Sequence, residues 1–140
     1  MKINKKVAIG VAAVLLLSAI AAPQLKELIK IVGVGAAVDR FGPDINKAVN
    51  KVSGHKDTSS MTTRTVPIIS VGRGRGAIGA AQVMGTKARV DQVKAVAQIE
   101  GEFLGEFRIR VLVPVSSKDV IKDIRRVEGV GVSGILDLKL

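Results

Sequence analysis

The chain has 140 residues, and its 22 Lys and Arg against 12 Asp and Glu give a formal net charge of +10 at pH 7. It has no Cys and one His, which excludes a disulfide framework, a cysteine-based zinc or iron–sulfur site and a thiol nucleophile. It has no Trp or Tyr and three Phe, so stacking platforms for exposed bases are nearly absent. The hydrophobic fraction of 47% nevertheless predicts a folded domain.

The first 25 residues have the order of a membrane anchor or signal sequence. Three lysines within the first six residues precede an uncharged run over residues 7–22, which is nearly long enough to cross a bilayer. The positive-inside rule keeps the basic end in the cytoplasm. The sequence therefore predicts a single-pass membrane protein with its C-terminal domain on the non-cytoplasmic side. The alternative is a secreted or periplasmic protein, cleaved near Ala21.

Residues 26–52 predict a juxtamembrane helical segment. Within it, Gly33 and Ala37 are four positions apart, the spacing that allows two helices to approach closely in lipid, so they are candidate helix-packing residues. Residues 41–44 predict a break, followed by a short amphipathic helix. The small polar residues of segment 53–65 predict a linker.

Residues 66–140 predict an α+β domain. Strands are expected near 66–71, 77–84, 102–105, 107–115 and 130–139, and helices over 86–100 and 116–128. The tripeptide Ile99-Glu100-Gly101 recurs as Val127-Glu128-Gly129, which we interpret as a duplicated strand–helix–strand unit.

A doubled unit of this kind predicts a ferredoxin-like split βαβ sandwich, with a four-stranded antiparallel sheet and two helices on one face. Residues 66–71 would add an edge strand or an arm to it. The other face of the sheet would remain open to a partner or to a second copy.

The segment 72–79 is rich in Gly and Arg, and its glycines satisfy the pattern G-x-G-x-x-G directly after a strand-like run. The chain beyond it is too short for a dinucleotide-binding domain, so we expect no cofactor. A second functional interpretation is an anion site, in which Arg73, Gly74, Arg75 and Gly76 bind phosphate, a lipid headgroup or nucleic acid. The structural alternative is a flexible turn with solvated arginines.

Two further patterns bear on function. Residues Gln82–Gly85 followed by 90–101 resemble the BON domain, a small α/β module of exported envelope proteins, and the resemblance implies lipid or envelope binding. The basic charge is concentrated at the N-terminus and in segment 72–79, so we do not expect nucleic acid as a partner.

The acidic residues fall mainly on the polar faces of the expected helices, without a nucleophile or an acid–base pair beside them. We therefore expect no enzyme, no catalytic or metal-binding residue and no small-molecule substrate. The expected function is that of a membrane-anchored structural or assembly module, with membrane lipid, a second copy, or an envelope or coat protein as its partner. The alternative is an anion-binding module that uses segment 72–79.

Overall fold

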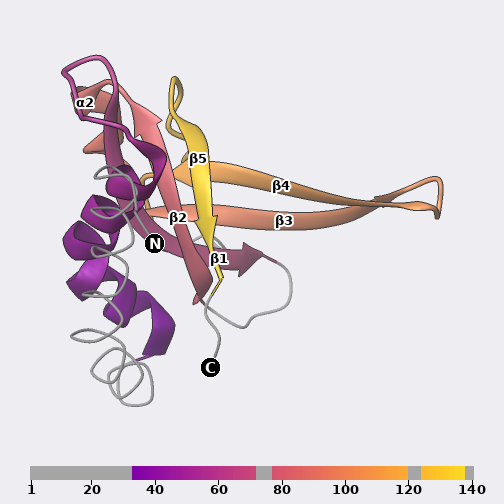
Figure 1. Cartoon of the computed structure of the whole chain (residues 1–140). Coiled ribbons are helices and arrows are strands. Elements are labelled where there is room, and N and C mark those ends of the chain that lie inside the picture. The colour runs from indigo at the N-terminus through magenta and orange to yellow at the C-terminus, as the bar shows by residue number, and fades with distance from the viewer. Residues whose placement is uncertain (1–32, 72–76, 120–123, 138–140) are drawn as a thin grey trace, which may run out of the picture.

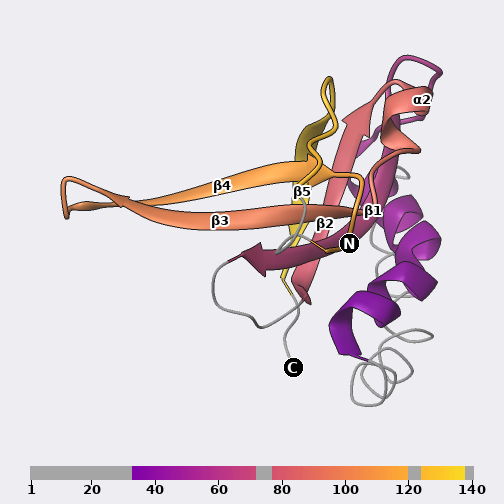
Figure 2. The ribbon, with the colours of Figure 1, turned by 180° about the vertical axis from the view of Figure 1, so that it is seen from behind.

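A computed structural model describes residues 33–71, 77–119 and 124–137. In this part of the chain, a five-stranded mixed sheet lies beside a helix over residues 33–53, called helix 33–53 below (Figures 1 and 2). The remaining elements are β1 (Thr62–Val71), β2 (Ala77–Gly85), α2 (Lys87–Val90), β3 (Ala95–Phe103), β4 (Phe107–Val115) and β5 (Gly131–Leu136).

The sheet has the strand order β4-β3-β1-β2-β5, so the first strand is the central one. The pair β1–β3 is parallel, and the other three pairs are antiparallel. Pro67 lies in this central strand although it has no N–H to donate. It is tolerated on the side of β3 because β3 pairs with β1 only from Ile68 onward, so no hydrogen bond to β3 is lost. β1 begins at Thr62, within the segment that the sequence indicates as a linker.

Apolar side chains pack on both faces of the sheet. One core cluster joins β1, β2, β3 and the α2 region, and it contains Val66, Ile68, Val83, Val90 and Val96. A second cluster of Ala95, Ala97, Val113 and Val115 lies at the base of β3 and β4, with Ile69, Val71 and Ile99 packed against it. Since alternate residues of β1 and β3 enter different clusters, both faces of these strands are buried at this end of the sheet.

Helix 33–53 turns its buried residues Ala37, Val38, Ile45 and Ala48 inward. The predicted break at residues 41–44 is wrong, because the helix continues through them. Gly42 serves close packing here: a Cβ at this position would lie 3.0 Å from the carbonyl oxygen of Thr65.

The predicted ferredoxin-like sandwich is also wrong, because the sheet has five strands, mixed direction and a different order. Residues 95–100, predicted as part of a helix, belong to β3. The apolar run from Ala95 to Ala97 lacks the alternation of a half-buried strand because both faces of β3 are covered at its start. The helix predicted over 86–100 is limited to the single turn α2.

The two similar tripeptides do not form a repeated unit. Residues 99–101 lie within β3, whereas Val127 follows an isolated bridge between Val115 and Arg126, and Gly129 has a positive φ of 75°. No helix over 116–128 is found in the described residues of that stretch. The strand predicted over 107–115 is confirmed as β4.

The predicted single-pass membrane localisation is corrected as well. Among the described residues, no helix has both the length and the apolar character needed to cross a membrane. The apolar run over residues 7–22, on which that prediction depends, and the cleavage site near Ala21 lie outside the described residues.

The close approach of β2 to the turn before β5 gives a test of this fold. A Cβ at Gly85 would lie 2.9 Å from the carbonyl oxygen of Gly129, so we expect Gly85→Ala to lower the free energy of unfolding by about 1–3 kcal/mol. At Gly131 a Cβ meets nothing within 4 Å, and Gly131→Ala is the matched control, with no loss expected. Urea unfolding of both variants checks this, and equal stabilities would contradict the packing described.

Candidate functional site

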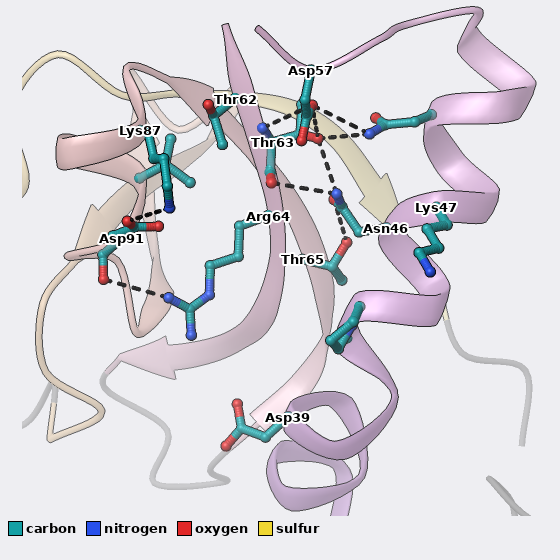
Figure 3. Close-up of a pocket in the computed structure, with 14 residues that line it drawn as sticks. Asp39, Asn46, Lys47, Asp57, Thr62, Thr63, Arg64, Thr65, Lys87 and Asp91 are labelled. Atoms are coloured by element: carbon teal, nitrogen blue, oxygen red, sulfur yellow. Dashed lines mark hydrogen bonds and ion pairs between the residues drawn. The ribbon is translucent and has the colours of Figure 1, made fainter. Parts of the chain in front are cut away.

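A polar cleft of about 450 Å³ lies between helix 33–53, β1 and α2 (Figure 3). Asn46 and Asn50 line it from the helix, Thr63 and Thr65 from β1, and Asp91 from the end of α2. The sequence pattern does not reveal this cleft, because its polar residues come from segments up to several tens of positions apart.

The amides of the cleft bond to one another and to the sheet. Asn46 Nδ2 donates to Thr63 Oγ1 at 2.9 Å, and Thr65 Oγ1 donates to Asn46 Oδ1 at 3.0 Å. Gln82 Nε2 on β2 donates to Asn46 Oδ1 at 3.0 Å and to Asn50 Oδ1 at 2.7 Å. Among the described residues, every buried side-chain polar atom has a partner. The network therefore attaches the helix to the sheet and leaves no buried polar group that needs a ligand.

Asp57 and His55 fix the loop above this network. Asp57 Oδ1 accepts from the N–H of Thr63 at 3.1 Å and from its hydroxyl at 2.7 Å. His55 Nε2 lies 3.1 Å from Asp57 Oδ1 and 2.9 Å from the carbonyl oxygen of Met61. Because the imidazole does not meet the hydroxyl and Thr63 is buried, these groups do not form an activated nucleophile.

The charged residues at the cleft rim bond to their neighbours. Lys87 Nζ lies 2.8 Å from Asp91 Oδ2, Arg64 Nη1 donates to the carbonyl oxygen of Asp91 at 3.4 Å, and Asp39 is paired with Lys118. In the part of the chain that the structure describes, no group of three or more His, Asp or Glu is placed to hold a metal ion. The hydrogen bonds of the cleft join the helix to the sheet.

Of the candidate site residues named from the sequence, the structure describes Gly33 and Ala37. Arg73, Gly74, Arg75 and Gly76 lie outside the described residues, between the end of β1 and the start of β2. Ala37 is fully buried, whereas Gly33 is exposed and has a φ of 87°.

The strands β3 and β4 form an arm that projects far beyond the rest of the sheet, away from helix 33–53 (Figures 1 and 2). The two strands pair with each other in register from Ala95–Val115 to Phe103–Phe107, while β1 pairs with β3 no further than Ile99. All residues from 100 to 110, which we call the arm, are exposed.

The arm has one apolar face and one charged face, because residues paired across antiparallel strands share a face and successive residues alternate. The apolar face consists of the pairs Ile99–Val111 and Phe103–Phe107, with Ile109 opposite Gly101 between them. The charged face carries two pairs of opposite charge, Glu100–Arg110 and Glu102–Arg108. Opposite charges at these positions stabilise the ribbon.

The apolar face continues the second core cluster into solvent. Its inner residue Ile99 packs against that cluster, as does Val71 at the end of β1. The outer residues and the tip keep between 42% and 77% of their surface exposed: Phe103, Leu104, Phe107, Ile109 and Val111. With about 150–250 Å² for a whole aromatic side chain, these five residues expose roughly 500 Å² of mainly apolar surface. A patch of this size lies within the range of the largest apolar patch on monomeric proteins, which is often functional, so the apolar face is a candidate interaction surface.

The turn at the tip places a large apolar residue in an unfavourable conformation. The N–H of Glu106 bonds to the carbonyl oxygen of Phe103, and the two central residues, Leu104 and Gly105, have φ values of 56° and 68°. Turns with two positive φ values favour Asn-Gly, and leucine costs about 1 kcal/mol or more in this region. Because Leu104 is also exposed, nothing in the described part of the chain compensates for it.

Comparison with protein families, with curated proteins and with solved structures finds no match to this chain. The resemblance of residues 82–101 to the BON domain therefore finds no support from a family model.

The polar network can be tested with neighbouring residues of the helix. We expect Asn46→Ala to lower the free energy of unfolding by about 2–3 kcal/mol, because Gln82 and two threonines lose a buried partner. Lys47→Ala is the control, since Lys47 is exposed and a surface change of this kind stays within about 0.5 kcal/mol. Thermal unfolding of both variants measures the two changes in stability. Similar losses of stability in the two variants would show that the network does not hold the helix.

Proposed function

We propose that this protein is a non-enzymatic structural module that assembles with a second copy of itself through the apolar face of the β3–β4 arm. The observation that carries the proposal is the exposed row of Phe103, Phe107, Ile109 and Val111 on an arm that packs against nothing else in the described chain. Burial of such a row against another apolar surface is the main source of free energy in protein association.

The distribution of charge favours a protein surface over an anionic lipid or nucleic acid as the occupant. The arm carries three glutamates, at positions 100, 102 and 106, against Arg108 and Arg110, so it has no basic excess. The apolar residues also follow one face along the whole arm and do not gather only at the tip. A flat apolar row with a charged reverse side is suited to packing against another sheet.

The area of this surface fits a second copy. Two arms that bury their apolar faces against each other would remove roughly 1,000 Å² of total surface from water, near the lower limit for a specific interface. The same patch serves both partners in a two-fold assembly, so no second docking surface is needed. We expect an association that depends measurably on protein concentration.

Substitutions at neighbouring positions of β4 test the proposal. Ile109 lies on the apolar face and Arg110 on the charged face, so Ile109→Gln and Arg110→Gln place the same side chain on opposite sides of one strand. Because each dimer loses two apolar contacts, we expect Ile109→Gln to weaken association by about 2–4 kcal/mol, roughly 30-fold or more in Kd. Arg110→Gln should leave association nearly unchanged.

Sedimentation equilibrium over a range of protein concentrations measures this. A wild-type chain that stays monomeric at all accessible concentrations would overturn the proposed function. An Ile109→Gln variant that associates as tightly as Arg110→Gln would exclude the apolar face.

Replacement of Leu104 should stabilise the fold and weaken the association of two copies. Leu104→Asn creates the turn sequence Asn-Gly, which accepts the observed φ values, so the free energy of unfolding should rise by about 1 kcal/mol. The same change removes the most exposed apolar side chain of the arm and should weaken association. Thermal unfolding and sedimentation equilibrium on one sample check both signs, and Leu104→Met is the control that keeps an apolar tip.

A further inference from the structure

We infer that two copies meet as a closed two-fold dimer in which the arms lie antiparallel, apolar face against apolar face, with the axis at the Gly101–Ile109 pair. This inference rests on the proposed function and adds the arrangement and the number of copies. The Gly101–Ile109 pair is the middle of the row, with Ile99–Val111 on the inner side and Phe103–Phe107 on the outer side.

The alternative arrangement, in which β4 of one copy pairs edge to edge with β4 of the other, is opposed by charge. Arg108 and Arg110 lie on the same face of β4, and antiparallel pairing of two β4 strands brings arginines of the two copies together. Like charges at such positions are unfavourable, and charged residues on edge strands prevent this kind of pairing.

The inner part of the β4 edge is already occupied by the same chain. The N–H of Val127 bonds to the carbonyl oxygen of Pro114, and the N–H of Ser116 bonds to the carbonyl oxygen of Arg125. This part of the β4 edge is therefore not open to pairing with a second copy.

Side-chain size favours the antiparallel orientation of the two arms. In this orientation the large Phe103–Phe107 pair at the outer end of one row lies over the smaller Ile99–Val111 pair of the other copy. A parallel orientation would instead place all four phenylalanines at one end. Gly101 adds no side chain at the centre, and a Cβ there would meet nothing within 4 Å, so the two faces can approach closely at the axis.

The base of each arm limits how far the two arms can overlap. Ala97 and Val113, the next pair inward on the same face, are already buried within their own chain, so the partner's tip stops beside them. Each apolar face is then covered by the other, and no equivalent face remains for a third copy. The assembly should therefore end at two chains.

The absence of cysteine allows a direct test, because each introduced thiol is unique in the chain. We would prepare the full chain with Ile109→Cys or with Arg110→Cys and treat each with a short bis-maleimide crosslinker. In the inferred dimer the two thiols introduced by Ile109→Cys face each other across the axis. The two thiols introduced by Arg110→Cys lie on the outer faces, separated by two sheets that are about 10 Å apart.

We expect Ile109→Cys to give at least tenfold more crosslinked dimer than Arg110→Cys. In sedimentation equilibrium, the mass of the wild-type protein should rise with protein concentration and level off at twice 14.7 kDa. A mass that continues to rise would show an open assembly, which overturns the inference while the proposed function stands. Comparable crosslinking of both variants would show edge-to-edge pairing, which overturns the inference and also excludes the apolar face as the interface of the proposed function. A dimer in which neither thiol reacts would place the interface elsewhere and overturn both. A monomeric wild type would overturn the proposed function itself.

Discussion

The position of helix 33–53 depends on one buried amide, and the exposed arm is a consequence of that position. Gln82 is 2% exposed, and its Nε2 donates to Asn46 and Asn50 while its Oε1 accepts from Ser133 at 2.8 Å. One side chain thus connects the helix, β2 and β5. Because a buried amide without partners is costly, the helix is held over β1 and β2 and does not shift toward β3 and β4.

The arm is consequently a two-stranded ribbon without a covering layer. Ribbons of this kind are only marginally stable in water, and the buried base of the arm at Ala97 and Val113 attaches it to the rest of the sheet. The phenylalanine rings at the outer end, with centroids 6.2 Å apart, add a contact between the two strands. The apolar face is thereby held in a defined shape before any partner arrives, which lowers the entropic cost of binding.

Sequence patterns predict correctly those strands that have one apolar and one polar face, because only such strands alternate apolar and polar residues. β4 alternates apolar and charged residues over its outer half, and its predicted bounds, 107–115, match the structure. The start of β3 does not alternate because Ala95 and Ala97 enter one core cluster and Val96 enters the other, on opposite faces of the sheet. The break predicted at Gly42 illustrates a related limit, because the glycine is required by a contact with Thr65, 23 positions away.

The same distinction applies to the arm. Glu100, Glu102, Arg108 and Arg110 alternate with glycine or apolar residues in the sequence, but the helix predicted over 86–100 and the short strand predicted near 102–105 miss the first strand of the arm. That the apolar face lies in solvent could not be predicted, because exposure depends on where helix 33–53 packs. The polar network is equally hidden, since Asn46 and Gln82 are 36 positions apart.

An open apolar face carries a risk of unlimited association, and the charged residues of the arm restrict it. The arginines of β4 lie opposite Glu100 and Glu102 in the strand register, and at the strand edge they oppose pairing with another β4. Leu104 is unfavourable for the isolated turn, so its presence is consistent with selection for contact rather than for folding. The arm has a charged β4 edge, which opposes strand pairing, and a single apolar face. One second copy can cover that apolar face completely, and the pair then exposes only the charged faces of its arms to water.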